Sequence, residues 1–325
     1  MKAVWCDRPQ EADALTWTDV PVPEPGPGEV LIQVGAFGLN RADLEQRKGK
    51  YPPPQGTPPI LGLEVAGTVA QVGPGCVRFQ PGDPVMSLLS GGGYAEFAVA
   101  TEALCFAVPE GMAIPEAAGL PEAMMVAELA LFHLGRVTPD ARVLLHGGAS
   151  GITSFAIALC RALEMKVATT VSTPEKAAWA RGLGADLVIP YRTESFSEQI
   201  KGDPRFREVD FILDFVGAEI FEKNLTCLAR FGSLVLLNCH PGDRGQLPLG
   251  RLITGCQSVL GTVLRTRPLE HKILLAKGVK KRMLPLLAAG KIPSIVNHRF
   301  TADQVPQAHA LMESSAHLGK IIITI

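Results

Sequence analysis

A loop of small residues in the middle of the chain constrains the fold more than any other feature. The run Val143-Leu-Leu-His-Gly-Gly-Ala-Ser-Gly-Ile-Thr153 has the pattern of an apolar strand, a turn of small side chains and the start of a helix. Such a turn lets a pyrophosphate approach the bare backbone, and the helix start offers free N–H groups. The usual G-x-G-x-x-G spacing is absent, because Thr153 stands where a third small residue is expected. The loop indicates either a dinucleotide site or an ordinary strand-to-helix turn.

The segments on both sides of this loop favour the dinucleotide site. From about residue 123, apolar runs of strand length alternate with segments of helix length. The pattern predicts strands at 142–146, 166–171, 186–189, 209–214 and 233–237, and helices at 152–163, 174–182 and 220–230. This alternation is typical of βαβ crossovers in a parallel sheet. We therefore expect a doubly wound Rossmann domain at 123–265.

The first third of the chain has a different pattern of apolar residues. Short alternating runs at 30–34, 64–70 and 94–99 are separated by Gly and Pro turn signals. Many short strands at close spacing predict an irregular β-barrel or sandwich. A helical stretch is expected after about 265, and the final run, 320–325, is expected to complete the first domain's sheet. The fold class is thus α/β, with a β-rich domain at 1–122 and 266–325.

Composition excludes several classes of protein. Of the 325 residues, 47% are hydrophobic and 19% charged, which supplies a buried core and argues against disorder. Lys plus Arg (31) balance Asp plus Glu (32), so a dedicated nucleic-acid binder is not expected. The seven cysteines contain no Cys-x-x-Cys pair, which argues against a disulfide framework and a local zinc knuckle. The most apolar window, 117–135, is interrupted by Pro121, Glu122 and Glu128, so we expect a cytoplasmic protein without a membrane span.

The end of the second Rossmann strand bears on the choice of cofactor. NAD sites usually place Asp or Glu there, to hold the ribose 2′-OH. This chain has Ser172 instead, with Lys176 close behind. Loss of the carboxylate and a nearby cation favour the 2′-phosphate of NADPH. Alternatively, Ser172 and Thr173 cap a helix that begins at Pro174, and the two interpretations are compatible.

An ordered series of motifs runs through nearly the whole chain. It includes Pro25-Gly-Pro-Gly-Glu-Val30, Gly38-Leu-Asn-Arg-Ala-Asp43, Ile60-Leu-Gly-Leu-Glu-Val-Ala-Gly67, Gly91-Gly-Gly-Tyr-Ala-Glu96 and Gly319-Lys320. Together with the phosphate loop, this series resembles the zinc-independent quinone oxidoreductase (ζ-crystallin-like) branch of the medium-chain dehydrogenase/reductase superfamily. The resemblance implies a GroES-like first domain, a Rossmann second domain and a cleft between them for NADPH and substrate. It also implies a homodimer, or a tetramer built from dimers.

The resemblance also assigns residues to the substrate side. Zinc-dependent relatives place Cys where this chain has Asn40 and His where it has Leu63, so no metal is expected. Asn40, Tyr51 and Leu63 are implied to line the substrate slot, with Asn40 and Tyr51 as catalytic candidates. Tyr51 would contact the nicotinamide or substrate and donate a proton; the alternative is a ring packed on the proline run that follows it. Asp43 and Glu64 are expected to be structural, as carboxylates that bind backbone N–H groups.

The cofactor contacts are implied in the same way. The resemblance assigns Ser150, Gly151, Ile152 and Thr153 to the pyrophosphate, and Ser172, Lys176 and Tyr191 to the 2′-phosphate. It assigns Gly217, Asn238, Cys239, His240 and Pro241 to the riboses, and Thr262, Val263 and Leu264 to the nicotinamide. Val126 stands where relatives have a threonine near the nicotinamide. Arg265 and Arg267 either supply charge to the site or are surface residues.

The expected activity is NADPH-dependent reduction of quinones, by hydride or single-electron transfer, with a quinone or related electron acceptor as the partner. One alternative is an enal, enone or enoyl-thioester reductase on the same scaffold, for which Tyr51 would protonate the substrate. Another is a non-catalytic NADPH-binding protein. The one basic cluster, 277–282, is expected to be a solvated helix face rather than a nucleic-acid site.

Overall fold

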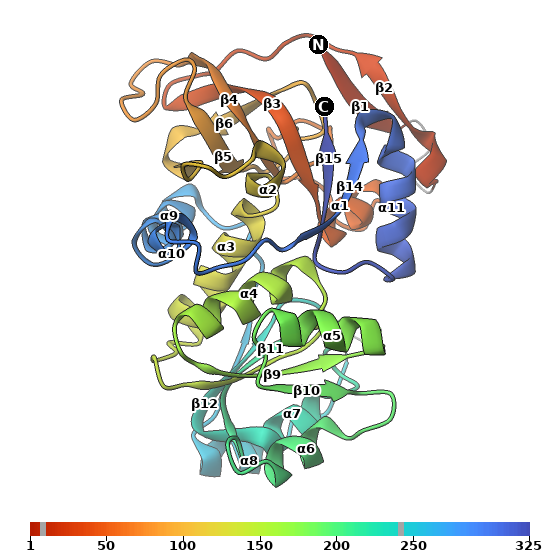
Figure 1. Cartoon of the computed structure of the whole chain (residues 1–325), viewed down its shortest axis with the longest axis vertical. Helices are drawn as coiled ribbons and strands as arrows, with labels where there is room; N and C mark the ends of the chain where they lie inside the picture. The colour runs from red at the N-terminus through yellow and green to blue at the C-terminus, as the bar shows by residue number, and fades with distance from the viewer. Residues whose placement is uncertain (7–10, 240–243) are drawn as a thin grey trace. The chain divides into compact units, whose positions relative to one another are not determined.

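The computed structural model of the chain describes all residues except 7–10 and 240–243. The described residues form two compact units (Figure 1). The first unit comprises Met1–Met125, Arg265–Ala289 and Ser294–Ile325, and the second comprises Val126–Leu264 and Gly290–Pro293.

A seven-stranded sheet organises the first unit, with the order β14-β15-β3-β4-β5-β7 and β6 paired to β3. Its strands are β3 (Glu29–Leu39), β4 (Glu64–Val72), β5 (Pro84–Leu88), β6 (Phe97–Thr101), β7 (Cys105–Ala107), β14 (Val296–Thr301) and β15 (Lys320–Thr324). An antiparallel pair, β1 (Lys2–Cys6) and β2 (Leu15–Asp19), forms a separate sheet. The predicted final strand is confirmed, because β15 pairs antiparallel with β3 and places Ile321 opposite Leu39 (Figure 1). Strand β14 was not predicted.

Helices of 4 to 14 residues connect or follow the strands of this sheet along the chain. They are α1 (Arg41–Arg47), α2 (Ile114–Ala117), α3 (Pro121–Ala127), α9 (Leu269–Arg282), α10 (Leu284–Ala288) and α11 (Val305–Ser314). The predicted helical stretch after 265 corresponds to α9 and α10, whereas α11 was not predicted. The basic cluster lies on α9, where Lys277 and Lys281 are exposed as expected, whereas Lys280 is half-buried. Its ammonium donates to the Ala103 carbonyl at 3.2 Å and lies 5.6 Å from the Phe106 ring, and burial lowers its pKa to about 8.

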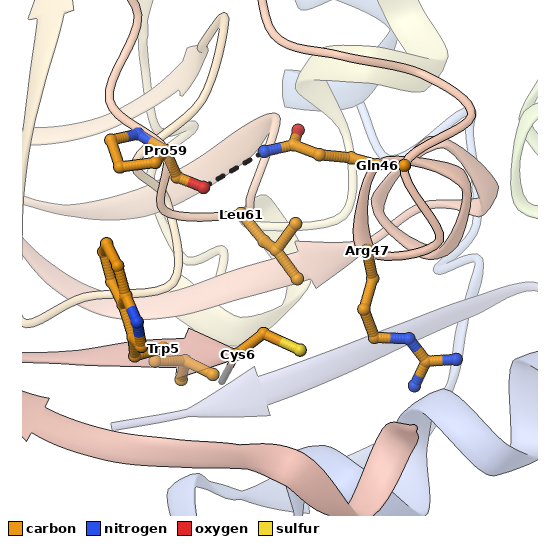
Figure 2. Close-up of a pocket in the computed structure, with 8 residues that line it drawn as sticks. Trp5, Cys6, Gln46, Arg47, Pro59 and Leu61 are labelled. Atoms are coloured by element: carbon orange, nitrogen blue, oxygen red, sulfur yellow. Dashed lines mark hydrogen bonds between the residues drawn. The ribbon is translucent and has the colours of Figure 1, made fainter. Parts of the chain in front are cut away.

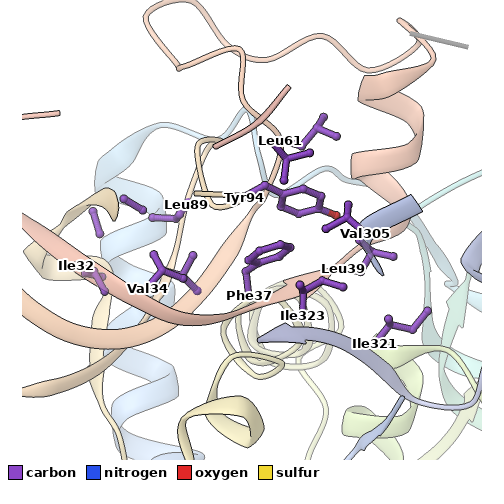
Figure 3. Packing of buried hydrophobic residues seen from close by; sticks show 14 of the residues in the cluster. Ile32, Val34, Phe37, Leu39, Leu61, Leu89, Tyr94, Val305, Ile321 and Ile323 are labelled. Carbon is purple, nitrogen blue, oxygen red and sulfur yellow. The ribbon is translucent and has the colours of Figure 1, made fainter. Parts of the chain in front are cut away.

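Strand β3 supplies the centre of the first unit's core (Figure 3). Phe37, on β3, stacks on Tyr94 with ring centroids 4.3 Å apart. The Tyr94 hydroxyl lies 3.2 Å from both Asp43 Oδ2 and His309 Nε2, so this fully buried phenol is hydrogen-bonded within the core. Ile323 of β15 and Val305 of α11 belong to the same cluster, so the C-terminal segment completes the core as well as the sheet.

The second unit contains a six-stranded parallel sheet with the order β10-β9-β8-β11-β12-β13. Its strands are β8 (Arg142–Leu145), β9 (Lys166–Val171), β10 (Leu187–Pro190), β11 (Val209–Asp214), β12 (Leu228–Leu236) and β13 (Ser258–Gly261). The helices are α4 (Gly151–Ala162), α5 (Pro174–Gly182), α6 (Phe196–Gly202), α7 (Phe221–Cys227) and α8 (Leu249–Gly255), and a π-helical turn, η3, spans Glu128–Leu134. This order is that of a doubly wound Rossmann sheet: β8, β9 and β10 are added successively in one direction, and β11, β12 and β13 in the other, so the strand order reverses between β8 and β11.

The predicted elements of this unit differ from the structure mainly at their ends. The helix at 174–182 has the predicted bounds. The helix predicted at 220–230 ends at Cys227, because β12 begins at Leu228 and runs further toward the N-terminus than the predicted 233–237. One helical run, Ile114–Leu134, is long and apolar enough to cross a membrane by length and composition, and 78% of its apolar window is buried inside the protein, as in a core helix.

Candidate functional site

The loop between β8 and α4 presents free backbone donors at the start of a twelve-residue helix. Ser150 is the N-cap, and its hydroxyl accepts from the Thr153 N–H at 3.2 Å. Gly147 has φ of +70°, which a residue without a side chain adopts at no cost. Within the described residues, the N–H groups of Ala149, Gly151 and Ile152 donate no hydrogen bond. Such donors at the positive end of a helix dipole fit the pyrophosphate of a dinucleotide.

Thr153 departs from the usual small residue without opening this loop. Its side chain is fully buried, and its hydroxyl donates to the His146 carbonyl at 2.9 Å. The hydroxyl therefore links the first turn of α4 to the end of β8.

The three residues assigned to the 2′-phosphate lie after two adjacent strands, β9 and β10. Ser172 directly follows β9, and Tyr191, which is 52% exposed, follows β10 and donates its N–H to the Val171 carbonyl at 3.1 Å. Thr173 is the N-cap of α5, since its hydroxyl accepts from the Lys176 N–H at 3.3 Å. The capping interpretation is confirmed for Thr173, and Lys176 lies in the first turn of the same helix.

The other cofactor candidates follow the ends of the remaining strands. Gly217 follows β11, Asn238 and Cys239 follow β12, and Thr262 and Val263 follow β13. Leu264 and Val126 are buried. His240 and Pro241 lie outside the described residues. The structure therefore gathers most of the assigned residues at the carboxyl edge of the parallel sheet, where ligands bind in folds of this kind; their individual contacts remain predictions.

In the first unit, a buried lysine contacts Asn40, one of the predicted substrate-side residues. The Lys320 ammonium contacts Glu64 Oε1, donates to Asn40 Oδ1 at 2.8 Å and lies 3.5 Å from the Leu39 carbonyl. Asn40 Nδ2 donates to Glu64 Oε1 at 2.8 Å. All three side chains are at most 8% exposed. Both ends of the Asn40 amide are therefore engaged inside the protein.

This group of residues does not fit a zinc ion. Zinc takes thiolate, imidazole or carboxylate ligands, whereas Asn40 offers an amide that is already bonded and Leu63 an apolar side chain that is 2% exposed. In the described part of the chain, no three His, Cys, Asp or Glu side chains are grouped as a metal site. The positive charge among these oxygens is the ammonium of Lys320.

The expected structural role of the two carboxylates is supported by their contacts. Asp43 accepts from the backbone N–H groups of Asn40 at 2.8 Å and Gly62 at 3.2 Å. Glu64 Oε2 accepts from the Glu122 N–H at 2.9 Å. Burial raises the pKa of Asp43 to about 6.

Tyr51 lies against a buried arginine. The guanidinium of Arg265 is 5.3 Å from the Tyr51 ring and donates to the Ser90 carbonyl at 2.8 Å and to Gln46 Oε1 at 2.6 Å. Arg265 is 5% exposed, so the surface alternative for this residue is wrong. The Tyr51 hydroxyl has no hydrogen-bond partner among the described residues. Burial, with a further contribution from Glu122, raises its pKa to about 12, so it is a neutral donor at physiological pH.

Gln46 connects Arg265 to the loop that follows Tyr51. Its Nε2 donates to the Pro59 carbonyl at 3.2 Å (Figure 2). The same side chain borders a pocket of about 210 Å³, together with Trp5, Arg47 and Leu61. The amide of Gln46 thus uses one end to hold the guanidinium and the other to hold the loop.

Two charged residues near Tyr51 or its neighbour Arg265 were not identified as site residues from the sequence. Glu122 is half-buried, and burial, followed by the charge of Glu64, raises its pKa to about 8. Lys272 donates to the Arg265 carbonyl at 2.7 Å, and burial lowers its pKa. Glu122 stood beside a proline in an apolar window, which signals a buried carboxylate, whereas no local pattern marks Lys272.

The raised pKa of Glu122 makes stability depend on pH. Unfolded, the carboxyl ionises near 4.5, whereas in the fold it keeps its proton until about pH 8. The unfolded state therefore loses its proton first, and the unfolding free energy falls as pH rises between these values. Glu122→Gln should stabilise the protein relative to wild type at about pH 8.5 and be nearly neutral at about pH 4, in urea denaturation. An equal difference at both pH values would contradict this assignment.

Removal of the buried Lys320 ammonium should lower the stability of the protein. Lys320→Met keeps a long unbranched side chain but removes the terminal ammonium and leaves Glu64 without its cation, which should lower the unfolding free energy by about 3–5 kcal/mol. Adding Glu64→Gln should restore part of the loss. The control is Lys2→Met, since Lys2 forms an exposed ion pair with Asp19 and should cost at most about 1 kcal/mol. A Lys320→Met cost equal to that of the control would refute a central role for the cluster.

Comparisons with known proteins agree with this architecture. The chain is 31% identical over 320 residues to a quinone oxidoreductase of Pseudomonas aeruginosa and 30% identical over 321 residues to a 2-haloacrylate reductase of Burkholderia, covering 96% of this chain and 95% of each relative. The solved structure of the Escherichia coli quinone oxidoreductase complexed with NADPH matches with a TM-score of 0.87 and 25% identity, over 100% of both chains. This similarity supports a nicotinamide cofactor.

Another relative is much longer than this chain. The chain is also 30% identical over 305 residues to the phthioceranic/hydroxyphthioceranic acid synthase of Mycobacterium tuberculosis, but those residues span 14% of that protein's length. Sequence profiles described as "Alcohol dehydrogenase GroES-like domain" and "Zinc-binding dehydrogenase" match residues 26–110 and 151–277. From the two domain matches and the full-length relatives, the chain belongs to the medium-chain dehydrogenase/reductase superfamily.

Proposed function

We propose that this protein is an NADPH-dependent, zinc-independent reductase of quinones in the ζ-crystallin-like branch of its superfamily, and that within this branch it is most similar to the tumour-suppressor-inducible quinone oxidoreductase. One observation carries the proposal: free N–H donors at the start of α4 lie at the carboxyl edge of a Rossmann sheet whose second strand ends without a carboxylate. A full-length relative named quinone oxidoreductase supports the substrate class, whereas one named 2-haloacrylate reductase supports the second candidate given below, since a haloacrylate is an α,β-unsaturated acid.

The residues of the second unit account for cofactor binding. The N–H groups of Ala149, Gly151 and Ile152 would hold the pyrophosphate, and Lys176 would pair with the 2′-phosphate. When bound, the cofactor supplies a hydride, or electrons one at a time. In two-electron reduction, the quinone takes the hydride and one proton and leaves as the hydroquinone. An electron-poor ring forms a stabilised phenolate, which water can protonate, so the protein needs to orient the reactants rather than supply a strong acid.

Residues of the first unit would shape the substrate side. The neutral hydroxyl of Tyr51 is free to donate, and Arg265 holds the Tyr51 ring from one face. Leu63 would supply an apolar wall, and Asn40, fixed by Lys320 and Glu64, would be a rigid part of the slot. The same hydroxyl also supports the second candidate, an enal, enone or enoyl-thioester reductase, because that reaction requires protonation of the substrate α-carbon.

The experiment that separates these candidates is a screen of cofactor oxidation. NADPH and NADH are each tested with benzoquinones, naphthoquinones, α,β-unsaturated ketones and enoyl thioesters. We expect the highest kcat/KM with NADPH and a quinone. A higher value with an enoyl thioester would favour the second candidate. Tight NADPH binding without oxidation by any acceptor would indicate a non-catalytic NADPH-binding protein.

The choice of cofactor can be tested at one residue. Lys176→Ala removes the proposed partner of the 2′-phosphate and should weaken NADPH binding about tenfold while leaving NADH nearly unchanged. Binding is measured by the fluorescence of the reduced nicotinamide. Lys166→Ala is the matched control, because Lys166 is exposed at the opposite, amino end of β9. Equal losses for NADPH and NADH would remove Lys176 from the 2′-phosphate site.

We also propose a homodimer, in the cytoplasm, formed through the second unit. Strand β13 is an edge of the sheet and pairs only with β12 among the described strands. Helix α8, which precedes it, exposes Leu249 and Ile253 at 61% and 75%. An unpaired strand edge beside exposed apolar side chains suits a second copy of the same chain. Sedimentation equilibrium should give twice the monomer mass, and Ile253→Asp should shift it toward the monomer; a monomeric wild-type protein would overturn this proposal.

A further inference from the structure

A buried polar network lies directly beneath the phosphate loop and has no place in the chemistry described above. His146, the last residue before Gly147, is 2% exposed. Its Nδ1 lies 2.9 Å from Thr170 Oγ1, at the end of β9, and its Nε2 lies 2.8 Å from Asn224 Oδ1, on α7. Asn224 Nδ2 donates to Asp214 Oδ2 at 2.9 Å, at the end of β11. The network therefore joins the ends of three adjacent strands, β9, β8 and β11.

The direction of every hydrogen bond in this network is determined by its last member. Asp214 Oδ1 accepts from two backbone N–H groups and Oδ2 accepts from Asn224, so the amide nitrogen faces Asp214 and the amide oxygen faces the imidazole. His146 Nε2 must then carry the proton. Burial lowers the pKa of His146, so the ring is neutral and Nδ1 accepts from the Thr170 hydroxyl. Only one tautomer satisfies all the partners.

Each end of the network forms hydrogen bonds with a loop whose residues are assigned to the cofactor. At one end, Thr170 Oγ1 lies 3.4 Å from the Gly147 N–H, and the His146 carbonyl accepts from Thr153 in the first turn of α4. At the other end, Asp214 Oδ1 accepts from the backbone N–H groups of Val216 at 2.6 Å and Gly217 at 3.1 Å, where Gly217 has φ of +85°. No side chain of the network needs to touch the cofactor for the two loops to depend on it.

We propose that His146, Asn224 and Asp214 are positioning residues that fix the pyrophosphate loop and the 215–217 loop relative to each other, and so set the affinity for the dinucleotide. This inference rests on the proposed function, because it requires that the second unit binds NADPH. All the affected contacts belong to the nucleotide rather than to the reacting ring. Loss of the network should therefore raise KM for NADPH while leaving kcat at saturating cofactor nearly unchanged.

The test replaces the central amide with a group that titrates. In Asn224→Asp, a protonated carboxyl can still donate to Asp214 and accept from His146, whereas the ionised form places two carboxylates against each other. At each pH, the Kd of Asn224→Asp for NADPH is divided by the Kd of wild type. This ratio should be near one at about pH 6 and about ten at about pH 8.5. Asn224→Leu should weaken binding at both pH values. The control is Ile200→Ala, which removes buried core volume on α6 and should lower the melting temperature without changing Kd.

The outcomes distinguish failure of the proposed positioning role from failure of the proposed function. The positioning role is overturned, and the proposed function kept, if wild type binds NADPH and the folded variants Asn224→Asp and Asn224→Leu bind it equally well. The same conclusion follows if Asn224→Asp changes the Kd by the same factor at both pH values. A wild-type protein that binds no NADPH overturns the proposed function and this inference together. A fall in kcat at saturating NADPH, with KM unchanged, would also contradict a positioning role in nucleotide binding.

Discussion

The first unit depends most on the contacts that the buried Lys320 ammonium makes with β3 and β4. A charge taken out of water is stable only when paired and hydrogen-bonded, and here Glu64 supplies the counter-charge while Asn40 and the Leu39 carbonyl supply further oxygens. Lys320 begins β15, Leu39 ends β3, and Glu64 begins β4, so one cation joins three neighbouring strands of the sheet. Glu64 then extends the connection to the backbone of α3 through the Glu122 N–H.

The same cluster explains why zinc chemistry does not suit this chain. A cation is already present as part of the polypeptide, and it is held by an amide and a carboxylate in fixed positions. An ammonium does not act as a Lewis acid toward a substrate oxygen, so the reaction that suits this arrangement is one in which the acceptor stabilises its own developing charge. A quinone meets that condition better than a simple carbonyl compound, which agrees with the proposed substrate class.

In the second unit, the controlling constraint is the parallel sheet. Parallel strands bring all their carboxyl ends to one edge, so residues far apart in the sequence, such as Gly147, Tyr191 and Thr262, follow strand ends of the same edge. The His146 network adds a second layer beneath this edge, because it fixes the strand ends of β9, β8 and β11 to one another. Thr153 belongs to both layers: it occupies a position in the phosphate loop and its hydroxyl binds the His146 carbonyl.

The sequence was sufficient for the features that depend on local pattern. The alternation of apolar runs predicted the Rossmann strands, and residue types alone argued against zinc at Asn40 and Leu63. Strand β13 was missed because only Val259 and Leu260 are apolar in it, and β14 because polar residues at Asn297, His298 and Arg299 interrupt its apolar pattern. The buried positions of Lys320 and Arg265 could not be predicted, since the partners of each lie more than 170 residues away along the chain. The roles assigned to individual cofactor contacts remain predictions.

The central claim is that this scaffold reduces quinones with NADPH and without a metal. The most direct measurement combines metal analysis by mass spectrometry with the rate of NADPH oxidation by a naphthoquinone, before and after exhaustive treatment with a strong chelator. We expect substoichiometric zinc and an unchanged rate, because Asn40 and Leu63 do not provide zinc ligands and the quinone stabilises its own developing charge. Stoichiometric zinc that is removed together with the activity, and restores it when added back, would contradict this account.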